Sequence, residues 1–108
     1  MSAINTMKTA YICSPYRNEV ERNKLYAQLI TLYAIKQGYA PITPHLYLTE
    51  CLDDDVPRQR NIGMSVGQAL LEKCDVLLCG TRYGISEGMT EELRLAKKLK
   101  IEIIEVNL

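Results

Sequence analysis

The stretch Thr9-Ala10-Tyr11-Ile12-Cys13 decides the fold. It is a nearly continuous apolar run of strand length within Lys8 to Ser14, and Pro15 stops it. A strand that is apolar on both faces is typical of a parallel sheet, because both faces of such a sheet are covered. Three more strands are predicted farther along the chain, at Tyr39 to Thr43, Asp75 to Gly80 and Ile101 to Val106.

Helices are predicted between these strands. Asn18 followed by Glu21 resembles a capping box, and apolar residues then recur at helical spacing until Gly38. These apolar residues are Val20, Tyr26, Leu29, Ile30, Tyr33 and Ala34.

A second helix is predicted from Pro57 to about Lys73 and a third from Gly88 to about Lys100. The apolar residues at helical spacing in the second helix are Ile62, Val66, Ala69 and Leu70. Turn residues and the acidic run Asp53-Asp54-Asp55 predict a long loop over Pro44 to Val56.

Strands and helices that alternate in this way indicate a small doubly wound α/β domain, Rossmann-like or flavodoxin-like. We expect about four parallel strands with helices on both faces, in a single domain over residues 1–108 with an ordered core of about 8–106. In such sheets the ligand crevice lies beyond the carboxyl ends of the strands. Here those ends are Ser14 to Arg17, Pro44-His45 and Gly80 to Gly88.

Composition excludes several classes of function. The 108 residues carry 13 basic and 13 acidic side chains, so no long-range positive field favours nucleic acid. No apolar run approaches the length of a membrane span, and the N-terminus does not resemble a signal peptide, so a cytoplasmic protein is expected. The sequence also lacks the glycine-rich fingerprints of dinucleotide-binding and P-loop proteins, and no cofactor is expected.

The cysteines do not form a metal-binding pattern. Cys13, Cys51, Cys74 and Cys79 lack C-x-x-C spacing, and His45 is the single histidine. We therefore expect neither a zinc site nor a disulfide, and we interpret Cys13 and Cys79 as small core hydrophobes.

One carboxylate in the last helix points toward the sheet. At about 100° per residue, Glu92 lies in the middle of the apolar face, with Met89 and Ala96 on one flank and Leu95 and Leu99 on the other. A carboxylate in this position is either a structural cap or ion-pair partner, or a nucleophile or base in a partly dry crevice.

Polar residues at the strand ends are further candidates. Ser86, Gly88 and Met89 enter the last helix, where free N–H groups hold an anion or a sugar oxygen, and Ser86 also fits an N-cap. Ser14 and Arg17 follow the first strand and suit a phosphate or ribose, although an arginine on a turn is often exposed to solvent.

Two features of the middle loop leave alternatives open. His45 is either a base or ribose contact or a satisfied structural residue. The run Asp53-Asp54-Asp55 closes over a ligand, presents a cation site or caps the next helix. A hard cation requires oxygens from several segments, and this run is only one.

Three motifs resemble the nucleoside 2-deoxyribosyltransferase-like superfamily. They are Tyr11-Ile-Cys-Ser-Pro-Tyr-Arg17, Pro41-Ile-Thr-Pro-His45 and Ser86-x-Gly88-Met89-x-x-Glu92-x-x-x-Ala96. The likeness spans Lys8 to Val106 and is greatest to small DUF4406-like and DUF7768-like members, which are common in bacteria and phages.

The resemblance implies a chemistry and a set of site residues. The glutamate that matches Glu92 attacks the anomeric carbon of a deoxyribosyl group and forms a glycosyl-enzyme, as in retaining glycosidases. The resemblance also implies a sugar or phosphate pocket lined by Tyr11, Ser14, Arg17, Ser86, Gly88 and Met89. Characterised hydrolases carry an aspartate before the third strand, where this chain reads Val66-Gly67-Gln68-Ala69. The chain is also shorter than a full transferase and lacks the C-terminal extension of those enzymes.

Two functions of the crevice follow as hypotheses, beside a third interpretation as a purely structural partner domain that binds no small molecule. The first is N-glycosidic-bond cleavage or (deoxy)ribosyl transfer on a nucleoside or nucleotide through Glu92. The second is a non-catalytic nucleotide sensor or sequestering protein that uses the same crevice. Because relatives complete a shallow crevice with a second subunit, we also expect a homodimer or higher homo-oligomer through the helices after Asn18 and Pro57.

Overall fold

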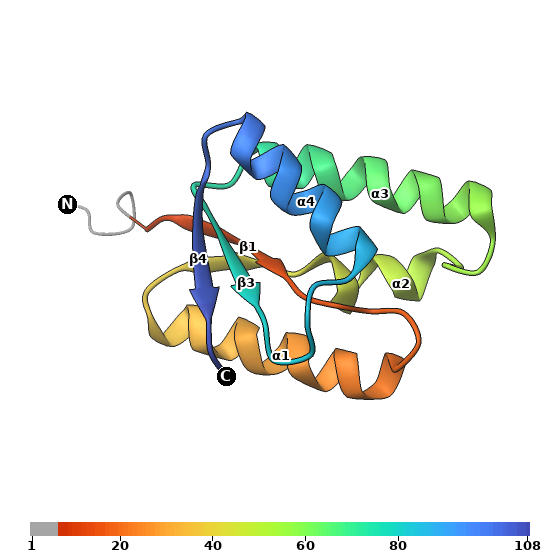
Figure 1. Cartoon of the computed structure of the whole chain (residues 1–108), viewed down its shortest axis with the longest axis horizontal. Coiled ribbons are helices and arrows are strands. Elements are labelled where there is room, and N and C mark those ends of the chain that lie inside the picture. The colour runs from red at the N-terminus through yellow and green to blue at the C-terminus, as the bar shows by residue number, and fades with distance from the viewer. Residues whose placement is uncertain (1–6) are drawn as a thin grey trace.

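Four parallel strands form one sheet in the computed structural model, which describes residues 7–108 (Figure 1). The predicted doubly wound α/β class is confirmed. In chain order the elements are β1 (Thr9–Cys13), α1 (Val20–Lys36), β2 (Ala40–Ile42), the 3-10 turn η2 (Pro44–Leu46), α2 (Leu48–Cys51), α3 (Pro57–Glu72), β3 (Val76–Gly80), α4 (Glu87–Lys98) and β4 (Glu102–Val106).

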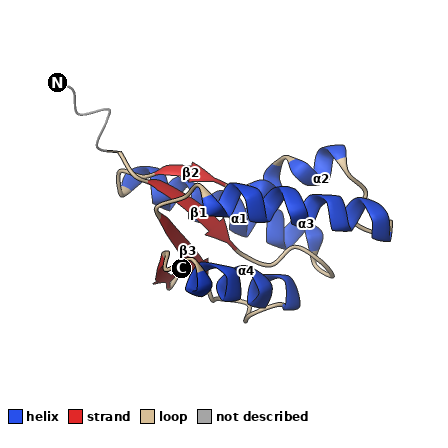
Figure 2. Cartoon of the chain, turned by 90° about the horizontal axis from the view of Figure 1, so that it is seen from above, coloured by secondary structure: helices blue, strands red, loops and turns tan. Residues whose placement is uncertain are grey.

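The strand order is β2-β1-β3-β4, so the chain reverses its direction across the sheet between β1 and β3. The registers place Tyr11 beside Leu77 and Cys13 beside Cys79. Figure 1 shows α1 on one face of the sheet and α3 and α4 on the other, and Figure 2 shows α4 on the β3 side and α2 on the β2 side. The carboxyl ends of β1 and β3 therefore meet at the switch point, where α/β sheets bind ligands.

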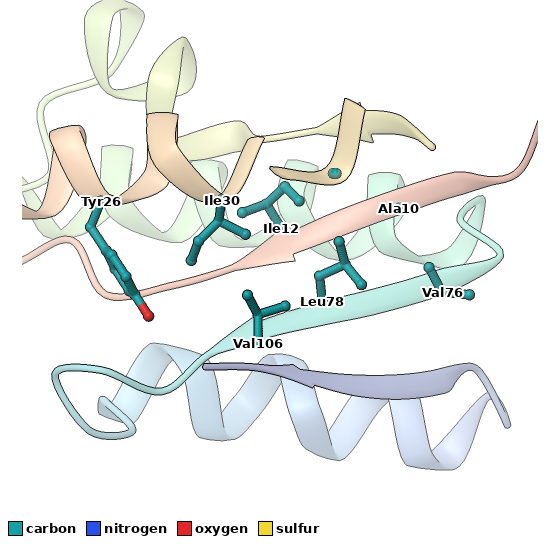
Figure 3. Packing of buried hydrophobic residues seen from close by; sticks show 8 residues of the cluster. Ala10, Ile12, Tyr26, Ile30, Val76, Leu78 and Val106 are labelled. Carbon is teal, nitrogen blue, oxygen red and sulfur yellow. The ribbon is translucent and has the colours of Figure 1, made fainter. Parts of the chain in front are cut away.

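Each face of the sheet has its own core, because successive side chains of a strand point to opposite faces. Side chains of β1, β3 and β4 pack against α1, as Figure 3 shows for Ala10, Ile12, Tyr26, Ile30, Val76, Leu78 and Val106. On the other face the buried cluster consists of Tyr11, Cys13, Leu71, Cys74, Leu77, Cys79, Met89 and Ala96.

The predicted capping box at the start of α1 is wrong. Asn18 has a left-handed backbone with φ of 77°, and the helix begins at Val20 after an N-cap, Glu19, whose side chain accepts no capping hydrogen bond. Instead, the buried Asn23 amide donates to the carbonyls of Tyr16 and Arg17 at 2.9 and 3.3 Å. A side chain inside the helix thus holds the preceding loop in place of a cap.

The buried faces of α1 and α3 differ in part from the predicted ones. In α1, Tyr26, Ile30 and Ala34 are buried as predicted, but Val20 and Leu29 are exposed. In α3, the buried residues are Gly67 and Leu71, whereas Ile62, Val66 and Ala69 are exposed. Both helices have apolar residues on more than one side, so the apolar spacing alone does not identify the side that meets the sheet.

The segment Pro44 to Val56 is more ordered than the predicted loop. Pro44 begins η2, and α2 follows, with Thr49 Oγ1 donating to the His45 carbonyl at 2.9 Å. Proline suits a first helical turn because it has no N–H to satisfy there.

Candidate functional site

The hydroxyl of Tyr11 donates a hydrogen bond to Oε2 of Glu92 between β1 and α4. Alternation along β1 turns Tyr11 and Cys13 toward α3 and α4. Glu92 lies in the second turn of α4, between the buried Met89 and Ala96. The predicted inward direction of Glu92 is therefore confirmed, and its partner is a tyrosine 81 residues away in the chain.

Burial controls the charge of this carboxyl group. Loss of solvent raises the pKa of Glu92 from 4.5 to about 7, and hydrogen bonds from the Tyr11 hydroxyl and the Cys13 thiol oppose the rise. The carboxyl group therefore exchanges its proton near neutral pH. This is the range in which a carboxyl group serves as nucleophile, base or acid.

The two donors keep their own protons at neutral pH. Burial, together with the charge of Glu92, raises the pKa of Tyr11 far above its usual range. A hydrogen bond to Cys79, together with burial, raises the pKa of Cys13. Glu92 is therefore the group of this cluster that changes charge near pH 7.

A glycine of α3 makes room for the Tyr11 ring. A Cβ atom added at Gly67 would lie 3.2 Å from the Tyr11 hydroxyl oxygen, so the helix backbone passes directly over this group. Gly67 is the buried residue of the stretch Val66 to Ala69, and the other three are exposed. This part of α3 brings no acidic side chain to Glu92.

The turn that enters α4 is a capped helix start. Ser86 Oγ accepts from the Met89 N–H at 3.2 Å, which confirms the N-cap interpretation. Met89 is buried in the core and its sulfur accepts from the Ser86 N–H at 3.4 Å. Gly88 is exposed, with open space where a Cβ would lie. Of the three predicted residues, Ser86 caps the helix, Gly88 is accessible to a ligand, and Met89 is part of the core.

Ser14 and His45 form a separate, packed group. His45 stacks on Tyr16 with ring centroids 5.4 Å apart. Burial lowers the pKa of His45, so the ring is neutral, and its Nε2 donates to the Ser14 carbonyl at 3.0 Å. The Ser14 side chain is fully buried, and its hydroxyl has no hydrogen-bond partner among residues 7–108. The geometry of His45 agrees with the structural alternative.

Arg17 is paired with the acidic run. Its Nε lies 3.1 Å from Asp54 Oδ2, and its Nη2 lies 3.9 Å from Asp55 Oδ1. Asp53 Oδ1 accepts from the Asp55 N–H at 2.9 Å, and α3 has Val56 at its N-cap without a side-chain bond. The run therefore pairs with an exposed arginine and does not cap the helix.

An open cavity of about 650 Å³ adjoins this pair, and Glu92 is not among its lining residues. Those residues are Tyr16, Arg17, Asn18, Val20, Thr49, Glu50, Cys51, Leu52, Asp53, Asp54, Asp55 and Gln59. Within residues 7–108, no group of three or more His, Cys, Asp and Glu side chains is placed to hold a metal ion. No helix in the same part of the chain is long and apolar enough to cross a membrane.

The structure thus divides the predicted site residues into groups. Tyr11 and Glu92 are joined, and Ser86, Gly88 and Met89 precede Glu92 on the same helix. Ser14 and His45 touch each other, and Arg17 pairs with the acidic run. Sequence reasoning missed the roles of Cys13 and Gly67 beside Tyr11 and Glu92. The signals were the two-residue step from Tyr11 to Cys13, which places both on one face of the strand, and a glycine, Gly67, inside the predicted second helix.

A family described as a domain of unknown function (DUF7768) matches residues 8–106. The chain belongs to the DUF7768 family. No curated protein matches the sequence.

Two solved structures show the same fold as this DUF7768 chain. One is a 2-deoxyribosyltransferase from Bacillus psychrosaccharolyticus, with a TM-score of 0.71 and 15% identity over 90% of this chain and 70% of that one. The other is a 2-deoxyribosyltransferase from Leishmania mexicana, with a TM-score of 0.59 and 17% identity over 91% of this chain and 63% of that one. This DUF7768 chain therefore spans about two thirds of the length of these enzymes.

Proposed function

We propose that this DUF7768 protein cleaves the N-glycosidic bond of a nucleoside or nucleotide, or transfers its (deoxy)ribosyl group, with Glu92 as the nucleophile. The observation that carries the proposal is the half-buried Glu92 carboxyl group, which accepts a hydrogen bond from Tyr11 and exchanges its proton near neutral pH. The shared fold of the two 2-deoxyribosyltransferases supports this choice of substrate class.

The reaction would proceed in two displacements. An oxygen of ionised Glu92 attacks C1′ of the sugar, the C1′–N bond breaks, and the base leaves with the electron pair and takes a proton from solvent. Water or a second base then attacks C1′ and releases a proton to solvent, and the bond between C1′ and Glu92 breaks to restore the carboxylate. Both steps pass through an oxocarbenium-like transition state, so a fixed negative charge beside C1′ accelerates them.

Tyr11 would orient the nucleophile. Its hydroxyl, which remains protonated, holds Oε2 of Glu92 by a hydrogen bond and would leave Oε1 for attack. Gly88 and the N-terminus of α4 would offer the sugar an open surface next to Glu92.

One observation favours the second candidate function, which is binding without turnover. The buried residue of α3 beside Tyr11 is Gly67, and the stretch Val66 to Ala69 around it carries no acidic side chain that could protonate a leaving base. A sensor or sequestering protein needs no such acid. The two functions differ in whether free base is released.

Covalent trapping tests the proposal. A thermal-shift screen with nucleosides and nucleotides first identifies a bound ligand. The 2-fluoro analogue of that ligand should then leave a glycosyl adduct on Glu92, because the electron-withdrawing fluorine slows both formation and breakdown of the intermediate. Peptide mass spectrometry locates the adduct.

The adjacent Glu91 provides the matched control. Its carboxylate pairs with Arg94 on the surface, so Glu91→Gln should retain activity within a few-fold, whereas Glu92→Gln should lose about a thousandfold or more. Equal activity of the two variants would exclude Glu92 as the nucleophile. Ligand binding without release of free base by the unmodified protein would establish the sensor function instead.

A further inference from the structure

Helix α1 is apolar on two opposite sides. One side packs against the sheet through Tyr26, Ile30 and Ala34 (Figure 3). The opposite side carries Leu25, Leu29, Leu32 and Ile35, which are 67%, 44%, 48% and 54% exposed. In Figure 1, α1 is the long helix on its side of the sheet, and no other element of residues 7–108 lies over its outer surface.

These side chains form one continuous surface, here called the outer face of α1. At 3.6 residues per turn its members fall within an arc of about 120°. The members of the outer face are Glu21, Leu25, Gln28, Leu29, Leu32, Ile35 and Lys36, and all of them are exposed. A contiguous apolar patch with charges at its rim is the usual form of a protein interface.

The charges of the outer face are arranged for a second copy of the same face. Glu21 lies at one end, Lys36 lies at the other, and the members of the outer face between them are uncharged. Arg22 and Lys24 lie just outside its two edges, and Lys24 is paired with Glu50 of α2. A parallel pair of such helices would oppose like charges. An antiparallel pair opposes Glu21 of each copy with Lys36 of the other, which is the self-complementarity that a two-fold axis requires.

We propose that the protein forms a homodimer in which the outer faces of α1 pack antiparallel about a two-fold axis near Gln28 and Leu29. This crossing point brings Leu25 opposite Leu32 of the second copy and Glu21 opposite Lys36. The spacing of Leu25, Leu29 and Leu32 matches the ridges that let two helices interdigitate.

The exposed residues of α3 fit a second copy less well. Ile62 and Val66 are 45% and 38% exposed, and Arg58, Asn61 and Ser65 interrupt the surface around them. Substitutions on α3 therefore serve as controls for substitutions on the outer face of α1.

Single charge reversals with rescue test the proposed pairing. The unmodified chain should have the mass of a dimer at tens of micromolar in sedimentation equilibrium. Glu21→Lys and Lys36→Glu should each weaken the dimer about tenfold, because each reversal opposes like charges twice across the axis. The double variant Glu21→Lys, Lys36→Glu should restore the affinity, since every pair is again opposite in sign. A monomeric unmodified chain, or a double variant no tighter than the single variants, would overturn the proposal.

Substitution of an exposed leucine tests the same surface independently of charge pairing. Leu25→Glu should give a monomer with unchanged circular dichroism, because the side chain is two-thirds exposed and lies outside the core. Ile62→Glu on α3 is the matched control and should remain dimeric. The reverse pattern would place the interface on α3 and overturn the assignment to α1.

Cross-linking locates the axis. In a Cys51→Ser background, which removes the exposed native thiol, Gln28→Cys should form a disulfide-linked dimer on mild oxidation, because this residue lies beside its copy. Glu72→Cys at the end of α3 should not. Equal cross-linking of the two variants would contradict the proposed axis.

Discussion

At the scale of single residues, Glu92 links stability to pH. The folded-state pKa of about 7 lies above the ordinary value of 4.5, so folding favours the protonated carboxyl group. The contribution of Glu92 to the free energy of unfolding is greatest below pH 4.5, decreases as the pH rises, and becomes constant above pH 7.

Glu92→Gln is always neutral and should avoid this loss. Relative to the unmodified chain, its free energy of unfolding should gain about 1–3 kcal/mol between pH 4.5 and pH 8. Urea unfolding at a series of pH values measures the difference. Glu91→Gln should show no comparable trend, and a pH-independent difference for Glu92→Gln would contradict a buried, titrating carboxyl group.

The donors to Glu92 should be visible in its titration. Tyr11→Phe removes the hydroxyl that stabilises the carboxylate, so the pKa of Glu92 should rise above about 7. Cys13→Ala should shift the pKa in the same direction by less, because a thiol is a weaker donor. Carbon-13 NMR of the glutamate carboxyl groups follows the titration without a substrate. Cys74→Ala, in the same core cluster, is the control and should leave the Glu92 value in place.

At the scale of elements, the end of β3 is fitted to α1. A Cβ atom added at Gly80 would lie 2.2 Å from Ile30 Cδ1 and 2.8 Å from the Tyr26 hydroxyl oxygen. That hydroxyl accepts from the Arg82 N–H at 3.0 Å, so it is held in place. A side chain at residue 80 therefore displaces the Ile30 and Tyr26 side chains that pack α1 against the sheet.

Gly80→Ala should lower the free energy of unfolding by about 1–3 kcal/mol, the usual cost of overpacking a core. Chemical denaturation provides the measurement. Gly88→Ala is the matched control: nothing lies within 4 Å of its added Cβ, and alanine favours the helix, so stability should stay equal or increase slightly. Equal destabilisation by both substitutions would show that the close packing of Ile30 and Tyr26 against Gly80 does not determine the effect.

At the scale of the whole molecule, the proposed function and the proposed dimer use opposite faces of the sheet. The α3 and α4 face holds the carboxyl group proposed for chemistry. The opposite face has one long helix whose outer surface is apolar. Assembly through α1 would leave the face with Glu92 free for substrate.

Thermal stability should therefore depend on protein concentration. For a folded dimer that unfolds to monomers, a hundredfold increase in concentration should raise Tm by about 5 °C. Differential scanning calorimetry at several concentrations measures the shift. Leu25→Glu should abolish the dependence, and a constant Tm for the unmodified chain would argue against a dimer that is coupled to folding.

The sequence alone determined the strands, the parallel sheet and the direction of Glu92. These depend on local patterns: short apolar runs set the strands, and the spacing of Met89, Ala96 and Leu95 around Glu92 sets its direction on α4. Such patterns act within a few residues and need no knowledge of the remaining fold.

Only the tertiary structure decided which residues meet. Tyr11 and Glu92 are 81 residues apart in the chain, and Arg17 pairs with Asp54 from a different segment. The spacing of residues within one segment therefore predicts neither contact. The buried side of α1 could not be predicted either. The helix has apolar residues on two opposite sides, and the helical spacing fits the burial of either side against the sheet. The sheet selects one side through the fit of Ile30 and Tyr26 over Gly80, and this selection leaves Leu25 in solvent.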